Sequence, residues 1–173
     1  MKKFFFLFSF FFILVFNSES FGQSIAYANL DKIIKTSIVG KKIISYFSEK
    51  NNKILEELKK KELEIKEKEN KLIAQKNLLQ ETEFKKKVDL IKEEINKFND
   101  LSKSKINQLN VEKQTVSKAF LNEINKVIKE YAEKNKIDMI FSSNQMLIGK
   151  SSLDLTENIL QNVNKNIKNF EIN

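Results

Sequence analysis

Residues 135–149, NKIDMIFSSNQMLIG, decide the fold of this chain. The stretch holds two short apolar runs, 139–142 and 145–148, separated by Ser143 and Asn144. Serine and asparagine tolerate turn conformations, so the pattern predicts two short strands joined as a hairpin. Because an isolated two-stranded hairpin is only marginally stable in water, we expect a third strand to join it.

The only other strand candidate lies near the start of the chain. Residues 25–30, IAYANL, are short and rich in strand-forming side chains, and Asn29 and Asp31 are good helix-capping types. This stretch therefore predicts a strand that runs directly into a helix. For it to meet residue 140, the long segment between them must fold back on itself, since a single straight rod would keep the strands apart.

The intervening segment has the composition of a helix. Its lysine, glutamate and leucine are good helix formers, and it holds no proline. A helix that starts again at Thr36 and Ser37 carries an amphipathic apolar stripe that thins beyond Leu58. Polar residues interrupt the seven-residue repeat, among them Lys68, Lys105 and Glu112. We expect two helices of about 45 residues each, turning near residues 80–84 without a glycine or proline to mark the turn.

A second amphipathic helix follows the strands, with Ser152 or Asp154 as its cap. The predicted fold class is α+β, mostly α: a small β-containing body, a long helical hairpin resembling a coiled coil, and a C-terminal helix. We define residues 23–36 and 121–173 as the body, which is expected to mediate oligomerisation, and residues 37–120 as the arm.

Composition argues against an enzyme. The chain has no His, Cys, Trp or Pro and only three Gly. The usual general base, the thiolate nucleophile and the zinc ligands are therefore missing, and no glycine-rich phosphate loop can be assembled. Carboxylates are plentiful but scattered among lysines. The sequence predicts no catalytic, cofactor-binding or metal-binding residues, and no cofactor.

The chain is basic, with a formal net charge of +8. Every basic residue is lysine, and the absence of arginine argues against specific recognition of nucleic acid. The partners that suit this charge are anionic lipid, lipopolysaccharide or another exported protein. We expect no nucleic-acid partner.

The N-terminus has the layout of a secretory signal. Lys2 and Lys3 precede an apolar run, residues 4–16, and a polar segment with small side chains follows. Residues 1–22 are the expected signal peptide, with cleavage before Gln23. The alternative is an uncleaved membrane anchor, although the apolar run is shorter than the roughly 20 residues that span a bilayer.

The order of these elements resembles the Skp/OmpH family of periplasmic chaperones. The resemblance covers IAYANLDKIIKTS at residues 25–37, the lysine-rich helical hairpin, and KIDMIFSSNQMLIGKSSLDLTENIL at residues 136–160. It implies a periplasmic homotrimer whose bodies join through their short strands and whose arms enclose a cavity. In such a cage, unfolded outer-membrane proteins are held without ATP and kept from aggregating. The alternative is an exported coiled-coil structural or adaptor protein of the cell envelope.

The family offers no catalytic residues to transfer, so the candidate sites are contact surfaces. Apolar arm residues without an obvious partner are candidate client contacts, the alternative being that they pack across the hairpin: Leu63, Ile73, Leu78, Phe84 and Leu90. Three lysines near the arm tip are candidates for anionic lipid contact, the alternative being a solvated face: Lys85, Lys86 and Lys87.

A second set of apolar residues belongs to the body. The strands and their flanks are expected to form the body core and the subunit interface through seven residues: Ile25, Tyr27, Ile137, Met139, Phe141, Leu147 and Ile148.

Overall fold

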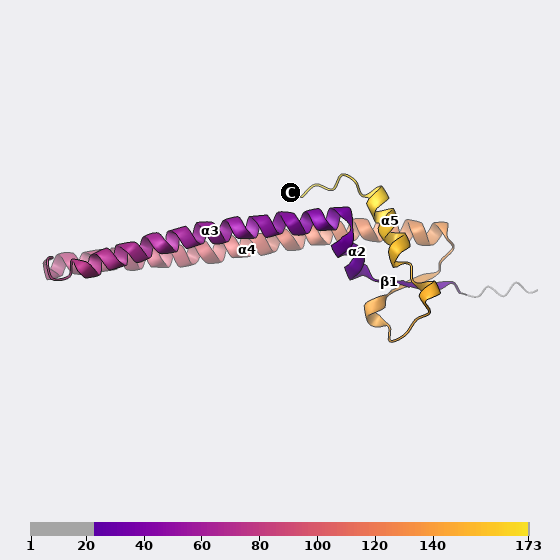
Figure 1. Cartoon of the computed structure of the whole chain (residues 1–173), viewed down its shortest axis with the longest axis horizontal. Coiled ribbons are helices and arrows are strands. Elements are labelled where there is room, and N and C mark those ends of the chain that lie inside the picture. Colours follow the sequence, from indigo (N-terminus) through magenta and orange to yellow (C-terminus); the bar gives the residue numbers. More distant parts are fainter. Residues whose placement is uncertain (1–22, 173) are drawn as a thin grey trace, which may run out of the picture.

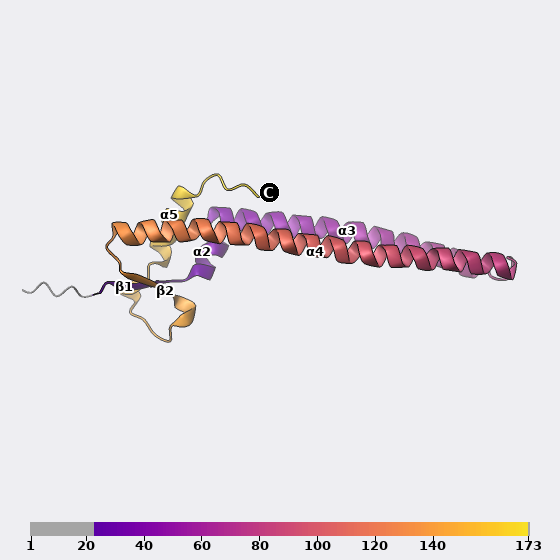
Figure 2. The ribbon, with the colours of Figure 1, turned by 180° about the vertical axis from the view of Figure 1, so that it is seen from behind.

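The structure, a computed structural model, describes residues 23–172. Two long helices lie side by side as an arm, and the short elements gather at one end of it as a body (Figure 1). Both long helices enter the body, where α4 extends further than α3, as the opposite view shows (Figure 2). The predicted signal peptide, residues 1–22, lies outside the described residues.

The sheet contains two parallel strands. Strand β1 (Ile25–Ala28) pairs with β2 (Met139–Ser142), so that Ile25 lies opposite Met139. The prediction that residues 25–30 would join the 139–142 strand, and that the helices would therefore fold back, is confirmed.

The predicted hairpin after β2 is wrong. Instead of turning into a second strand, the chain enters a short 3-10 turn, η1 (Ser143–Gln145). A two-residue hairpin loop needs positive φ at its centre, which Asn-Gly supplies and Ser-Asn does not. The Asn144 side chain donates to Asp31 Oδ2 at 2.9 Å, which ties the turn to the first helix instead.

Two capping residues set the path from the strand into the arm. Asn29 Oδ1 accepts from the Lys32 amide at 2.8 Å and starts α2 (Leu30–Thr36). Ser37 Oγ accepts from the Gly40 amide at 3.2 Å and starts α3 (Ile38–Ala74), so the chain changes direction at Ser37. Both helix starts occur where the capping pattern predicts them.

The arm consists of α3, of 37 residues, and the part of α4 (Glu81–Lys134, 54 residues) before residue 121, the rest of α4 lying in the body. The turn occupies residues 75–80, several residues before the predicted 80–84, and the Leu78 amide closes it by donating to the Gln75 carbonyl at 2.9 Å. The discrepancy has an electrostatic reason. Glu81 and Glu83 lie in the first turn of α4, where carboxylates interact favourably with the helix dipole.

Helix α4 ends in a left-handed residue that is not glycine. Lys136 has a φ of 54°. The Ile137 amide donates to the Ala132 carbonyl at 2.9 Å, and the Lys136 amide donates to the Glu133 carbonyl at 3.3 Å. This pair of bonds is the Schellman pattern of helix termination, and it aims the chain into β2.

The hydrophobic core lies where α2, α4 and α5 (Thr156–Asn166) meet in the body. Ile33, Ile124 and Ile159 come from these three helices and are fully buried. The C-terminal segment packs against the same core, where Phe170 makes an edge-to-face contact with Phe120 at 5.3 Å between ring centroids. Toward the tip, beyond Phe47 on α3 and before Leu109 on α4, the buried residues of the arm form a narrow seam on α3: Leu58, Ile65 and Leu72.

No helix within residues 23–172 is both long and apolar enough to cross a membrane.

Candidate functional site

One face of the small sheet is apolar and exposed. Because side chains alternate along a strand, Ile25 and Tyr27 of β1 share a face with Met139 and Phe141 of β2. Met139 is 45% exposed and Phe141 44% exposed, whereas Ala26 on the opposite face is buried. The single chain therefore presents a strip of large apolar side chains to solvent.

The loop after β2 extends this exposed apolar surface. Leu147 and Ile148 are almost completely exposed. The neighbouring Gly149 lies under the Tyr27 ring, whose nearest carbon is 2.7 Å from where a Cβ on this glycine would stand. Ile137, before β2, is half-buried. None of the seven residues predicted for the body core and interface is therefore among the buried residues of the single chain.

Most of the buried residues of the body come instead from the helices, although Ala26 and Ala28 of β1 are also buried. Phe120, Ile124, Ile159 and Val163 are at most 2% exposed. Within each helix they lie four residues apart, a helical spacing that the sequence shows, but the prediction of the core rested on the strands. The structure thus separates an interior built by helices from an exposed face built by strands.

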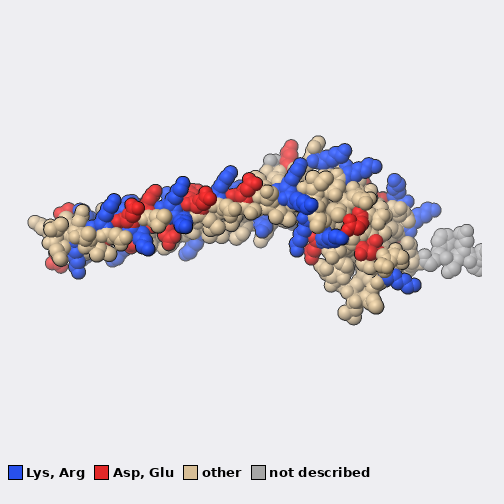
Figure 3. All heavy atoms as spheres, in the orientation of Figure 1, with Lys and Arg blue, Asp and Glu red and all other residues tan. Residues whose placement is uncertain are grey.

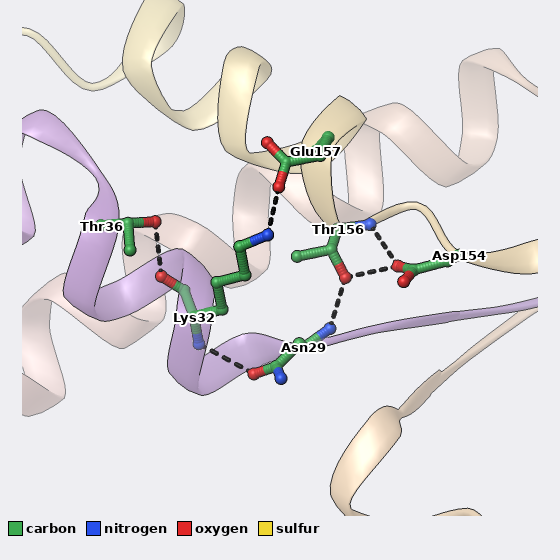
Figure 4. Close-up of polar contacts among 6 residues, drawn as sticks. All are labelled: Asn29, Lys32, Thr36, Asp154, Thr156 and Glu157. Atoms are coloured by element: carbon green, nitrogen blue, oxygen red, sulfur yellow. Dashed lines mark hydrogen bonds and ion pairs between the residues drawn. The ribbon is translucent and has the colours of Figure 1, made fainter. Parts of the chain in front are cut away.

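A polar cluster fastens the start of α5 to the start of α2 (Figure 4). The Thr156 hydroxyl accepts from the Asn29 amide at 2.8 Å and donates to the Asp154 carboxylate. Asp154 also accepts from the Thr156 amide at 2.9 Å. The N-cap position of α5 is occupied by Leu155, so neither Ser152 nor Asp154 is the N-cap that was predicted. Nearby, Glu157 forms an ion pair with Lys32 that raises the pKa of this lysine.

Four of the five predicted client contacts on the arm face solvent. Leu63, Ile73, Leu78 and Leu90 are all more than half exposed, with Leu78 at the tip reaching 83%. Phe84 is half-buried. The arm therefore carries isolated apolar side chains outside its own seam, which Leu58, Ile65 and Leu72 fill.

Charged pairs join the two arm helices at three levels. Lys50 contacts Glu112 at 2.5 Å, Lys105 contacts Glu57 at 2.7 Å, and Lys68 contacts Glu94 at 2.5 Å. The hydrogen bond from Lys50 lowers the pKa of Glu112, and the hydrogen bond from Lys105 lowers the pKa of Glu57. The polar residues that interrupt the repeat thus contact the facing helix, a role the sequence analysis missed.

The predicted lipid contacts, Lys85, Lys86 and Lys87, lie near the start of α4, close to the arm tip. Lys87 pairs with Glu83 at 3.3 Å. Lys85 and Lys86 form no ion pair within residues 23–172. Lysines and carboxylates are interspersed along the visible face of the arm (Figure 3).

Within residues 23–172, no group of three or more histidine, cysteine or acidic side chains is arranged to hold a metal ion.

These features define a class of protein: a long antiparallel helical hairpin on a small α+β body with an exposed apolar sheet face. Residues 24–163 match the model of the OmpH family, described as outer membrane protein (OmpH-like), and the chain belongs to that family.

A solved structure has the same fold. It is the crystal structure of a candidate outer membrane chaperone, OmpH-like, from Caulobacter crescentus CB15. The match has a TM-score of 0.80 and 13% sequence identity, and it covers 87% of this chain and 89% of the other. At this identity the likeness concerns the fold alone. No curated protein matches the sequence.

Proposed function

We propose that this protein is an ATP-independent holdase chaperone of the periplasm, which binds unfolded outer-membrane proteins between helical arms and keeps them from aggregating. Membership of the OmpH-like family and the likeness to a candidate outer membrane chaperone support a chaperone role. The observation that carries the proposal is the exposed apolar side chains of the arm, above all Leu78 at its tip.

The arrangement of these side chains suits a client without fixed shape. Leu63, Ile73 and Leu90 are exposed at separate places along the arm, so each offers a small contact and no deep pocket is needed. Fully burying one leucine side chain yields about 1.5–3 kcal/mol, so several partial contacts hold an unfolded chain while leaving each one weak. A client that is held by weak, distributed contacts can be released without ATP.

We further propose that the working form is a homotrimer joined through the exposed sheet face. Met139 and Phe141 are nearly half exposed in the single chain, and β2 has β1 as its only strand neighbour within the described residues. A second copy on this side would cover the apolar strip and the open edge together. In this proposal Ile25, Tyr27, Leu147 and Ile148 contribute to the same interface, with Ile137 beside it.

Anionic lipid or lipopolysaccharide is a further proposed partner of the arm tip, through Lys85, Lys86 and Lys87. The lysines follow exposed Leu78 by seven to nine residues in the sequence, and lysines with an exposed apolar side chain suit a charged headgroup beside acyl chains.

A dilution assay tests the holdase. An outer-membrane barrel protein unfolded in urea is diluted into buffer with or without the purified protein, and light scattering follows its aggregation. A holdase keeps the client soluble at a near-stoichiometric ratio in the absence of ATP. Precipitation at every ratio would contradict the proposal and favour a structural or adaptor protein of the envelope.

A further inference from the structure

A groove of about 580 Å³ lies between α3 and α4 where the arm leaves the body. Its walls are mainly apolar and include Ile44 and Phe47 from α3, Leu109 and Leu121 from α4, and Ile34 from α2. A volume of several hundred Å³ with apolar walls is typical of sites that bind ligands.

Small side chains line part of the groove. Ser48 on α3 and Ser117 on α4 lie at positions where larger residues would fill it. Ile44 is 52% exposed although it lies beside the buried Phe47. The body core therefore continues into a surface that the described residues leave uncovered.

Two lysines, Lys113 and Lys118, also line this groove. Both are exposed, and neither forms an ion pair in the part of the chain that the structure describes. Lys50 and Lys105, by contrast, pair with glutamates across the arm. The groove thus combines apolar walls with positive charge that no neighbouring carboxylate neutralises.

We infer that this groove is an anchor site for an extended apolar segment that carries acidic residues, the segment being part of an unfolded client. The apolar side chains of the segment lie against Ile44 and Leu109, and its carboxylates pair with Lys113 and Lys118. The inference rests on the proposed holdase function and adds to it a binding site of defined chemistry at the arm base.

The position of the groove agrees with this role. Ile34 lines it from α2, and α2 and β1 lie on the same side of the α3–α4 pair (Figure 1). In the homotrimer proposed above, subunits joined through their sheets would bring this side of each arm toward the others. A client between the arms then meets weak apolar contacts along the arm and a stronger, charge-selective anchor at its base.

Fluorescence anisotropy tests the anchor with the purified protein and a short fluorescein-labelled peptide that has a Leu-Phe-Val core and aspartates at both ends. A second peptide carries lysines in place of the aspartates. The expected result is preference for the acidic peptide by about tenfold in Kd. Ser117→Trp, which fills the groove, weakens binding of the acidic peptide by a similar factor, while Ser104→Trp, elsewhere on α4, leaves it unchanged.

Charge reversal provides the second test. In the double variant Lys113→Glu and Lys118→Glu the preference inverts, so that the lysine peptide binds more tightly. The control Lys66→Glu and Lys103→Glu makes the same change in net charge on exposed residues that do not line this groove, and keeps the original preference. Equal binding of both peptides, or an unchanged preference in the Lys113/Lys118 variant, overturns the anchor.

The experiments distinguish failure of the holdase proposal from failure of the anchor proposal. If the protein suppresses aggregation of the barrel client but binds neither peptide, the anchor is wrong and the holdase stands. If the acidic peptide binds in the groove while the barrel client precipitates, the holdase is wrong and the binding site stands.

Discussion

The carbonyl oxygen of Ile34 lies 1.7 Å from the position that a Cβ atom on Gly40 would occupy. The clash is with backbone, which cannot rotate away as a side chain can. Gly40→Ala normally stabilises a helix by about 1 kcal/mol, but here α2 must shift away from α3 and we expect a net loss of about 1–3 kcal/mol. Thermal denaturation followed by circular dichroism measures the change.

A matched substitution separates this contact from helix propensity. Asn52→Ala lies on the exposed face of the same helix and should raise the melting temperature slightly. If Gly40→Ala stabilises the protein as much as Asn52→Ala does, the backbone at Ile34 can move away from residue 40 at little cost.

Thr156 links two segments of the body and is 4% exposed. In Thr156→Val the shape is preserved, but the Asn29 amide loses its acceptor and Asp154 loses a donor. A buried polar group left without a partner costs about 1–3 kcal/mol, so we expect a loss of that size in chemical denaturation. Thr115→Val, on an exposed face of α4, should change stability by less than about 0.5 kcal/mol.

Lys136 adopts a conformation that glycine tolerates better. At a φ of 54°, a side chain with Cβ is strained by about 1 kcal/mol. Lys136→Gly should therefore stabilise the protein by up to about 1 kcal/mol, the gain being reduced by the greater freedom of glycine in the unfolded chain. Lys103→Gly, within α4, should destabilise by about 1 kcal/mol. A loss of stability in Lys136→Gly would show that the lysine side chain contributes more than its strain removes.

The Lys50–Glu112 pair gives a pH dependence of defined sign. The lysine lowers the pKa of Glu112 below its ordinary 4.5, so the stabilisation is present above that value and is lost as pH falls through the lowered pKa. The pKa of Lys50 is raised above 10.5, so its contribution is lost only as pH rises through that higher value. Between these limits Glu112→Gln should melt at a lower temperature than the native protein.

At acidic pH the difference in melting temperature between the native protein and Glu112→Gln should disappear. Below the lowered pKa of Glu112 the two proteins should melt alike, and added salt should narrow the gap at neutral pH because the pair is partly exposed. A melting difference that persists unchanged into strong acid would assign the effect of Glu112→Gln to packing.

Phe141 tests the proposed subunit interface. Phe141→Asp places a carboxylate on the exposed strip without disturbing the buried core, so the proposed trimer should dissociate into folded monomers in analytical ultracentrifugation. Val111→Asp adds the same charge at an exposed apolar position on the arm and should leave the trimer intact. A trimer of normal stability in Phe141→Asp would exclude the sheet face as the interface.

The helical architecture was predictable because it rests on local rules. The capping pattern located the starts of α2 and α3 at Asn29 and Ser37, and the need of residues 139–142 for a strand partner predicted the fold-back of the arm. The arm turn was misplaced because residues 75–80 hold no glycine or proline, and the acidic residues that follow are as compatible with a loop as with a first helical turn.

The candidate site was harder to predict from the sequence than the helical architecture. The exposure of Leu63, Ile73, Leu78 and Leu90 depends on the register between α3 and α4. Charged pairs such as Lys68–Glu94 join the two helices in this register. The groove beside Ile44 depends on which small residues face each other across the arm. Periodicity alone predicts neither these exposed residues nor the groove, because each requires knowing which residue of α3 lies opposite which residue of α4.

The parallel pairing of β1 with β2 constrains the order of folding. Ser24 and Asp138, which bond to each other beside the sheet, are separated by 114 positions in the chain. A loop of this length is costly to close, whereas the arm hairpin forms from helices joined by a short turn and brings the two strands close together. We therefore expect the body to complete last, after β2 and α5 have been synthesised, and a chain interrupted within α4 to leave β1 without its strand partner.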